Sequence, residues 1–275
     1  MKYTQLVNLL ALAGSAEPES EAFILLSHFF SADRAQILAF PEREYDSLPL
    51  DLAITRRSEG EPIQYIIGKA DFFGLEFKVS PDCLIPRYDT EILCEELVRR
   101  LPENSYFLEF CTGSGCIPIA VIKNRPDVSC TSVELFTETA DIARENRELN
   151  CVSADRLEII VGDALNFDSS RYAGKLDAIV SNPPYIPTSV VETLSREVKC
   201  EPRAALDGGA DGLIFYRKFV SSYSSALKPN GFFAFEIGFD QGESVKSLGI
   251  AAGLGVEIIR DYSGNDRVAI LKKNY

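Results

Sequence analysis

Residues 176–185 read Leu-Asp-Ala-Ile-Val-Ser-Asn-Pro-Pro-Tyr, a buried-strand pattern that runs directly into a proline turn. The two prolines lack a backbone N–H and hold their own φ near about −65°, which makes the turn stiff. Pro183 also biases Asn182 toward an extended backbone. The turn therefore presents an amide side chain, free carbonyls and an aromatic ring at the end of a strand, where open α/β sheets bind ligands. It suits a planar group that bears N–H donors, such as an amide or a nucleobase amine.

Strand and helix patterns alternate on both sides of this stretch, from Thr90 to the C-terminus. Strands are predicted at 105–110, 129–134, 156–161, 176–181, 231–237, 255–262 and 266–272. Helices are predicted at 90–100, 115–124, 137–149, 212–227 and 240–252. This alternation predicts crossover units and a largely parallel sheet. The last two strands join through the hairpin-type turn at 263–265, so the final strand is expected to be antiparallel.

The first 60 residues read as helices joined by short connections, which predicts a small helical bundle. Helical segments are expected at 6–13, 20–30, 34–40 and 46–57. The pattern then changes, because 63–67 and 71–79 carry the aromatic and β-branched residues that strands prefer. We predict a β-hairpin linker over 61–86, followed by an α/β domain over 87–275.

The amino-acid composition indicates which kinds of binding partner and which cellular compartment to expect. The net charge of −13 disfavours a nucleic-acid substrate, which requires Lys and Arg to neutralise phosphates, and favours a basic protein partner. Seven scattered cysteines, none in C-x-x-C spacing, and a single histidine disfavour a zinc site and suit a reducing cytosol. No apolar run has the length of a membrane span. We therefore expect a cytoplasmic protein with no metal, no membrane segment and no stable nucleic-acid partner. The sequence does not indicate an oligomeric state, and a monomer is taken as the default.

A glycine loop follows the predicted strand at 105–110. It consists of Cys111, Thr112, Gly113, Ser114 and Gly115. Two glycines allow a ligand to approach the backbone, and the helix that follows offers free N–H groups. Pro118 is compatible with that helix if the helix begins near Gly115. The loop lacks the third glycine of the dinucleotide fingerprint, and taken alone it is equally consistent with a plain tight turn.

Three carboxylates near this loop indicate the type of ligand. Glu134 ends the next strand, where a carboxylate can accept both ribose hydroxyls. Asp163 follows the third strand and can accept from an exocyclic amine, and Glu109 precedes the loop and can pair with an ammonium group. Each one alone is better explained as a cap or a strand-end salt bridge. Together with the loop they favour S-adenosylmethionine over NAD, since a pyrophosphate would avoid so many negative neighbours.

Further motifs extend along the chain. They are Glu61-Pro-Ile-Gln-Tyr-Ile66, Phe73-Gly-Leu75, Leu84-Ile-Pro-Arg87 with Thr90-Glu91, Glu201-Pro202, Ala205-Leu206, Gly208-Gly209 with Asp211-Gly-Leu213, Glu236-Ile-Gly238 and Asp266-Arg-Val268. With the glycine loop and 179–186, this set resembles the release factor glutamine methyltransferases (the PrmC/HemK family) over nearly the whole chain. The Asn-Pro-Pro-Tyr turn alone is shared with amino-directed DNA and RNA methyltransferases.

The resemblance implies an α/β protein: a Rossmann-like, seven-stranded, S-adenosylmethionine-dependent methyltransferase domain with an N-terminal helical bundle. It implies methyl transfer to the side-chain nitrogen (N5) of the glutamine in the GGQ motif of class I peptide chain release factors. S-adenosylhomocysteine would be the product, and no metal would take part. Residues 1–60 would then dock the release factor. Ala164 departs from the family, since some members carry an aromatic residue there against the adenine.

The resemblance also suggests roles for residues. Asn182 Oδ1 and the Pro183 carbonyl would accept the two amide N–H groups of the substrate glutamine, and Tyr185 would pack on its plane; Pro184 completes this turn. The expected cofactor-binding residues are Glu109, Cys111, Thr112, Gly113, Ser114, Gly115, Glu134, Asp163, Ala164 and Asn182. Arg87, Thr90 and Glu91 could either order the join between domains or touch the substrate.

Two other functions remain open on the residues alone. An N6-adenine methyltransferase acting on DNA or RNA would share the turn, but the acidic charge opposes it. A non-catalytic adenosine-binding scaffold would keep the fold, but it would not need an intact Asn182 and Tyr185.

Overall fold

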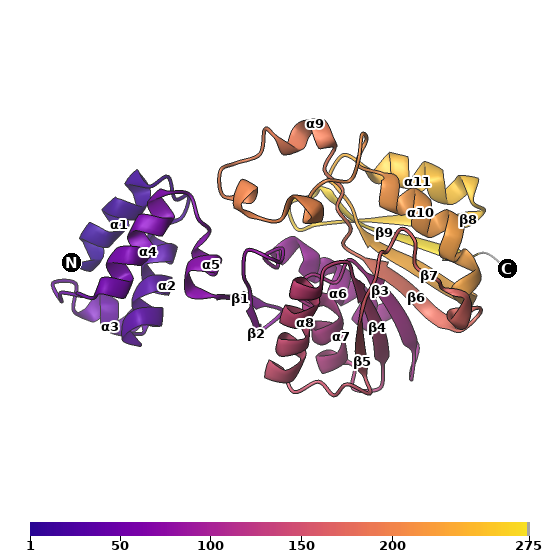
Figure 1. Ribbon diagram of the computed structural model, residues 1–275, viewed down its shortest axis with the longest axis horizontal. Helices are drawn as coiled ribbons and strands as arrows, with labels where there is room; N and C mark the ends of the chain where they lie inside the picture. Colours follow the sequence, from indigo (N-terminus) through magenta and orange to yellow (C-terminus); the bar gives the residue numbers. More distant parts are fainter. Residues whose placement is uncertain (274–275) are drawn as a thin grey trace. The chain divides into compact units, whose positions relative to one another are not determined.

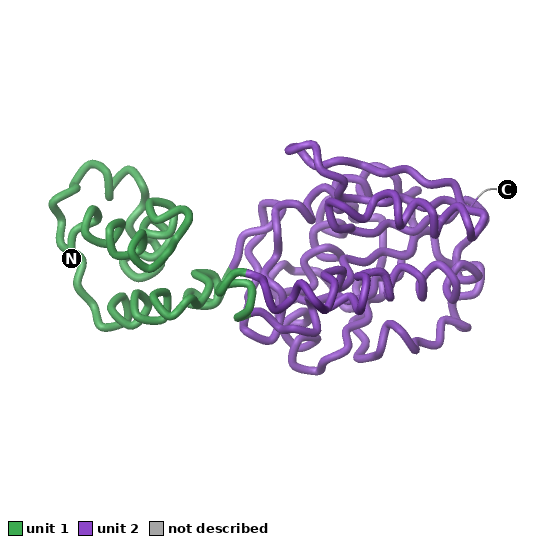
Figure 2. Tube along the Cα trace, turned by 90° about the horizontal axis from the view of Figure 1, so that it is seen from above, with its two compact units in different colours: residues 1–69, 195–200 green, residues 70–194, 201–275 purple. Residues whose placement is uncertain are grey.

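The computed structural model describes residues 1–273, which form two compact units (Figure 2). Unit 1 comprises residues 1–69 together with the short segment 195–200. Unit 2 comprises residues 70–194 and the chain from 201 onward. Each unit has its own hydrophobic core.

Unit 1 is a helical bundle. Its helices are α1 (Tyr3–Leu12), α2 (Pro18–Phe30), α3 (Arg34–Ala39), α4 (Leu48–Ser58) and α5 (Ile63–Ile67). Asp33 caps α3 by accepting a hydrogen bond from the Gln36 N–H at 2.7 Å, and Ser47 caps α4. The four helices predicted before residue 60 are confirmed.

The predicted strand at 63–67 is wrong, because this stretch forms helix α5. Gly68, with φ of 73°, ends the helix in the left-handed conformation that glycine readily adopts. Ile63 and Ile66 lie three residues apart, and both are buried in the core of unit 1. Burial of this helical pair outweighs the β-propensity of isoleucine.

A buried arginine joins the segment 195–200 to the helices of unit 1. The Arg57 side chain is 1% exposed and donates to Glu21 at 2.8 and 3.0 Å and to Glu197 at 2.5 Å. Arg196 donates in addition to the Ser58 carbonyl at 3.3 Å. Two carboxylates thus compensate one buried charge, and one of them comes from a residue 140 positions away.

The β-hairpin consists of β1 (Lys69–Phe72) and β2 (Leu75–Lys78). Phe73 and Gly74 form its turn with φ of 52° and 73°, the positive values that tight hairpin turns require. Phe72 and Phe77 are buried in the core of unit 2. The predicted linker over 61–86 is therefore divided, since its first part belongs to unit 1 and the hairpin packs into unit 2.

Unit 2 contains a seven-stranded sheet in the order β5-β4-β3-β6-β7-β9-β8. The strands are β3 (Tyr106–Phe110), β4 (Ser129–Glu134), β5 (Leu157–Val161), β6 (Leu176–Ser181), β7 (Leu227–Glu236), β8 (Leu254–Arg260) and β9 (Asp266–Lys273). The first five run parallel, and β9 lies antiparallel between β7 and β8. All seven predicted strands are confirmed, as is the antiparallel final strand.

Helices cover both faces of this sheet (Figure 1). One face carries α6 (Tyr88–Arg100), α7 (Cys116–Asn124) and α8 (Thr137–Leu149), and the other carries α10 (Ile214–Tyr223) and α11 (Gly242–Ala251). Short elements fill the connections: α9 (Thr188–Val191) and 3₁₀ turns at Ser170–Tyr172, Val198–Cys200, Arg203–Ala205 and Ser224–Ala226. Neighbouring strand residues such as Phe107 and Leu108 enter opposite cores, as expected for a sheet buried on both faces. No helix among residues 1–273 combines the length and apolarity needed to cross a bilayer.

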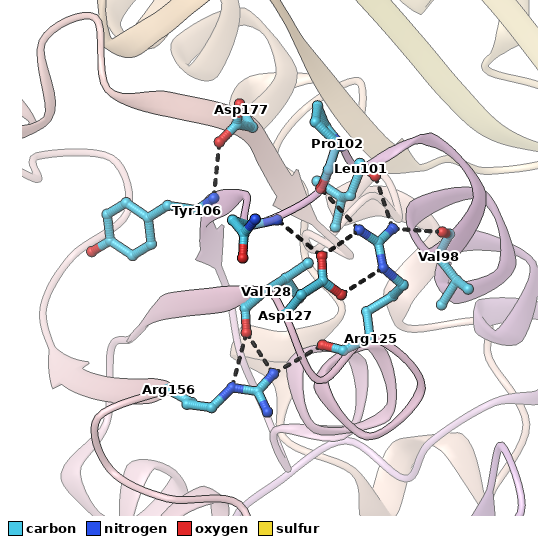
Figure 3. A network of polar contacts seen from close by, with 10 residues as sticks. Val98, Leu101, Pro102, Tyr106, Arg125, Asp127, Val128, Arg156 and Asp177 are labelled. Atoms are coloured by element: carbon cyan, nitrogen blue, oxygen red, sulfur yellow. Dashed lines mark hydrogen bonds and ion pairs between the residues drawn. The ribbon is translucent and has the colours of Figure 1, made fainter.

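A polar network holds the amino ends of the strands (Figure 3). Arg125 donates to the carbonyls of Val98, Leu101 and Pro102 at the end of α6, at 2.8–3.0 Å. Its guanidinium also contacts Asp127, whose carboxylate accepts from the Asn104 N–H. One side chain therefore satisfies carbonyls that a helix end leaves without partners.

Arg125→Ala is expected to lower the free energy of unfolding by roughly 1–3 kcal/mol, because several carbonyls lose their donor at once. Urea denaturation of the purified protein measures this. Arg99→Ala is the matched control, since Arg99 forms only an exposed ion pair with Glu96 and such pairs contribute little. Equal losses in the two variants would show that the network does not stabilise the fold.

Candidate active site at the carboxyl edge of the sheet

A pocket lies at the carboxyl ends of the central strands, and all of its lining residues belong to unit 2. Strand β3 sits between β4 and β6, so the strand order reverses at this position. Open α/β sheets bind ligands at such a switch point. Within residues 1–273, no three His, Cys, Asp or Glu side chains are grouped so as to hold a metal ion.

Most of the predicted site residues line this pocket. Those that do are Cys111, Thr112, Gly113, Ser114, Glu134, Asp163, Ala164, Asn182 and Pro184. Glu109, Gly115, Pro183 and Tyr185 are not among the lining residues. Segment 82–87 lines it as well, including Arg87, one of the residues expected either to order the join between domains or to touch the substrate. The apolar side chains of Phe136 and Phe215, to which sequence reasoning assigned no role, also line it.

The two glycines of the loop serve different purposes. Gly113 has φ of 57°, and no heavy atom lies within 4 Å of the place where a Cβ would sit, so the backbone is open to the pocket. Gly115 has φ of 78°, and a Cβ there would come within 3.3 Å of Ile119 and Ala143, so this glycine allows close helix packing. Helix α7 begins at Cys116, which places Pro118 in its first turn as the sequence required.

Glu134 and Asp163 both hold loop backbone while they line the pocket. Glu134 accepts hydrogen bonds from the Gly113 N–H at 2.9 Å and from the Leu135 and Phe136 N–H groups at 2.9 and 3.3 Å. Burial raises the pKa of Glu134, and these backbone donors oppose the rise. Asp163 accepts from the Leu165 N–H at 2.8 Å. Both carboxylates thus accept from nearby backbone N–H groups, and each keeps lone pairs for a ligand.

Glu109 is fully buried in β3. Its Oε2 accepts from the hydroxyls of Thr112 at 3.0 Å and Ser132 at 2.7 Å. Its Oε1 is buried and has no hydrogen-bond partner among the described residues. Burial raises the pKa of Glu109 to about 8. A buried oxygen without a donor is costly, so it marks a place where a ligand's N–H would be favourable.

The Asn-Pro-Pro-Tyr turn is held by a chain of side-chain hydrogen bonds. Asn182 donates from Nδ2 to Thr90 Oγ1 at 3.2 Å, and Thr90 donates to Glu236 Oε2 at 2.5 Å. Tyr185 donates its hydroxyl to Glu236 Oε1 at 3.3 Å. Burial raises the pKa of Glu236 to about 7 against the effect of the Thr90 hydrogen bond. The Oδ1 of Asn182 makes no hydrogen bond to residues 1–273 and remains available as an acceptor.

The glycine-rich segment after the turn packs against its backbone. A Cβ on Gly208 would lie 2.6 Å from the Pro184 carbonyl oxygen, and one on Gly212 would lie 2.2 Å from that of Tyr185. Gln241 donates from Nε2 to the Tyr185 carbonyl at 2.9 Å. A side chain at Gly208 or Gly212 would therefore displace the turn.

Arg87 and Glu91 were expected either to order the join between domains or to touch the substrate, whereas Asn146 was not singled out from the sequence. Arg87 forms an ion pair with Glu201, and Glu91 accepts from the Phe73 N–H at 2.7 Å, so both hold unit 2 together. Asn146 of α8 is buried and donates to the carbonyls of Ser114 at 2.9 Å and Lys78 at 3.0 Å. Asparagine has a low helix propensity, so its presence inside the predicted helix at 137–149 was the feature of the sequence that indicated a specific contact.

Glu109→Gln is expected to stabilise the ligand-free protein at pH 9 and to lose that advantage toward pH 5. The carboxyl pKa is about 8 in the folded state against an ordinary 4.5, so the folded state binds more protons between these values. The contribution of Glu109 to stability is therefore complete below pH 4.5 and is lost as pH rises through 8. Gln carries no charge and avoids this loss.

Urea denaturation of both proteins from pH 5 to pH 9 measures the difference, expected to be on the order of 5 kcal/mol at pH 9. Glu138→Gln, at an exposed position of α8, is the control and should show no comparable pH-dependent difference. If Glu109→Gln changes the free energy of unfolding by the same amount at pH 5 and at pH 9, the expectation is contradicted.

Comparison with known proteins agrees with this geometry. The family model described as PrmC N-terminal domain matches residues 3–68, and the one described as Methyltransferase small domain matches residues 88–229. A release factor glutamine methyltransferase of Moorella thermoacetica is 40% identical over 95% of this chain and 93% of its own. One of Caulobacter vibrioides is 37% identical over 95% of this chain and 92% of its own. A methyltransferase structure from Pyrococcus furiosus shares the fold, with a TM-score of 0.55 and 21% identity over 74% of this chain and 91% of its own. The chain belongs to the release factor glutamine methyltransferase family.

Proposed function

We propose that this protein transfers a methyl group from S-adenosylmethionine to the glutamine side-chain nitrogen in the GGQ motif of a class I release factor. We propose that it works as a monomer in the cytoplasm and supports translation termination. The observation that carries the proposal is the Asn182 amide, which is fixed through Nδ2 and has a free Oδ1 beside the pocket. The names of its relatives agree with this substrate.

The carboxylates of the site suit the hydrogen-bond donors of the proposed cofactor. We assign Glu134 to the ribose hydroxyls and Asp163 to the adenine amine, since both line the pocket. We assign Glu109, which is buried beside the glycine loop, to the ammonium of the amino-acid tail. The unpartnered Oε1 of Glu109 and the open backbone at Gly113 support this assignment. When bound, S-adenosylmethionine supplies a methyl carbon activated by the sulfonium. Phe136 and Phe215 provide apolar pocket surface near the small Ala164.

The protein's contribution to the chemistry is orientation and charge. A glutamine nitrogen is a poor nucleophile, because its lone pair is delocalised into the carbonyl. Asn182 Oδ1 and the Pro183 carbonyl accept the two N–H groups in the proposed complex and favour the positive charge that develops on nitrogen. The face of the Tyr185 ring supports the same charge. Fixing the nitrogen in this way supplies the orientation that the transfer needs.

Labelled S-adenosylmethionine tests the substrate when it is offered together with release factor, DNA and ribosomal RNA. We expect label on the glutamine of the release factor. Label on adenine would support the N6-adenine methyltransferase, which shares the turn. Cofactor binding without transfer to any of the three would support a scaffold.

Asn182→Ala is expected to lower kcat by about 10²–10³-fold, the typical loss on removing one preorganised polar partner. Asn182→Asp should lose at least as much, because its carboxylate would face the Thr90 oxygen without a proton between them. Asn124→Ala is the control, since that amide only donates to the Ala120 carbonyl. Normal turnover by Asn182→Ala would remove Asn182 from the mechanism.

We further propose that unit 1 docks the release factor. Its surface carries large exposed apolar side chains, including Leu12, Phe40 and Leu48 at 85%, 63% and 71% exposed. A single glutamine side chain provides little affinity, and exposed apolar groups are the usual anchors of a protein interface. Point substitutions test this better than deletion of 1–60, which would also remove Arg57 from Glu197.

The double substitution Phe40→Ser and Leu48→Ser is expected to raise KM for the release factor by roughly 10-fold or more, with kcat at saturation unchanged. Steady-state methylation over a range of release factor concentrations measures both constants. Ile250→Ser, at an exposed apolar position of unit 2, is the control. An unchanged KM in the double variant rejects the docking role of these residues.

A further inference from the structure

We infer that Thr90 is a positioning residue that sets which end of the Asn182 amide faces the substrate. The inference deepens the proposed function and rests on it. Thr90 and Asn182 both line the pocket, whereas Glu236 is not among the lining residues and is 2% exposed. The three residues come from α6, the turn and the end of β7, at separations of 92 and 146 positions.

Whether the Thr90 hydroxyl donates or accepts toward Asn182 follows from the fact that it has only one hydrogen to donate. A threonine hydroxyl has one proton to donate and lone pairs to accept. Its proton lies in the 2.5 Å hydrogen bond to Glu236 Oε2. Toward Asn182 it therefore offers only a lone pair, which accepts from Nδ2 at 3.2 Å. A reversed Asn182 amide would place two oxygens together with no proton between them.

Glu236 fixes this direction when its carboxyl is ionised, because both of its oxygens then accept. Oε2 accepts from Thr90, and Oε1 accepts from the Tyr185 hydroxyl at 3.3 Å. The charged groups nearby are Asp89 on α6 and Arg267 on β9, which pair with each other at 3.0 Å. The buried carboxylate thus holds Tyr185 directly and Asn182 through Thr90.

The consequence concerns nucleophile orientation. With Nδ2 occupied by Thr90, Asn182 presents Oδ1 as a hydrogen-bond acceptor. An acceptor selects an N–H-bearing atom at this point, which is the nitrogen end of a carboxamide. Without Thr90, the Asn182 amide is free to turn and present a donor, which would instead select the carbonyl oxygen.

The chain offers a matched control for the loss of one buried hydroxyl. Thr131 is 1% exposed, donates to Glu158 at 3.0 Å and shares a 2.6 Å hydrogen bond with the Tyr106 hydroxyl. It therefore has the same kinds of partners as Thr90, a carboxylate and a second polar side chain, but it does not line the pocket.

The test compares Thr90→Val, Thr90→Ser, Thr131→Val and Asn182→Ala, together with the T90V/N182A double variant. We expect T90V to lower kcat by about 10-fold to 100-fold, the scale of a misplaced reacting group, with KM for S-adenosylmethionine unchanged. T90S should restore kcat, and T131V should keep it. In the N182A background T90V should have almost no further effect, because Thr90 acts through Asn182.

A second measurement does not depend on activity. The side-chain NH₂ signal of Asn182, identified by its loss in N182A, should exchange slowly with solvent in the wild type and faster in T90V, with T131V unchanged. Wild-type protein that does not methylate glutamine rejects the proposed function and leaves this measurement to decide the positioning. The inference is overturned if T90V keeps wild-type kcat, if T90V costs the same with and without Asn182, or if the exchange rate does not change.

Discussion

Buried carboxylates whose hydrogen bonds come from neutral donors are the constraint on which the site depends. Glu109, Glu134 and Glu236 are each less than 10% exposed at the carboxyl edge of the sheet, and their hydrogen bonds come from hydroxyls and backbone N–H groups. Neutral donors fix these side chains in place and bring no positive charge to the edge, so a cationic ligand would favour their ionised forms. The pKa of each carboxyl is raised by burial. An edge of this kind favours a cationic ligand, and S-adenosylmethionine carries both a sulfonium and an ammonium.

The two ends of the parallel sheet have separate tasks. Guanidinium groups hold the amino ends. Arg125 donates to backbone carbonyls and to Asp127, and Arg156 donates to backbone carbonyls (Figure 3). The carboxyl ends hold acidic and amide side chains that line the pocket. Because β3, β4, β5, β6 and β7 run parallel, each of them sends its first residues to one edge and its last residues to the other. Stabilising contacts and ligand contacts can therefore differ in composition without competing for space.

The small unit depends on a contact that local patterns do not reveal. Arg57 is almost fully buried between Glu21 and a glutamate contributed by segment 195–200. Segment 195–200 lies shortly after the Asn-Pro-Pro-Tyr turn in the sequence, yet it belongs to unit 1. Removing Arg57 would leave two acceptors without their donor, and breaking a buried pair is far more costly than breaking an exposed one.

The sequence by itself determined the alternation of strands and helices, the glycine loop and the stiff turn at 182–185, because these follow from side-chain periodicity and from the backbone limits of glycine and proline. It misjudged 63–67, where packing of two isoleucines overrode local strand propensity. Only the tertiary structure decided that Thr90 and Glu236 fix Asn182, and that one oxygen of Glu109 stays without a donor. Partners separated by 92 and 146 residues are brought together by strand order and helix packing, and no local spacing encodes which side chains then meet.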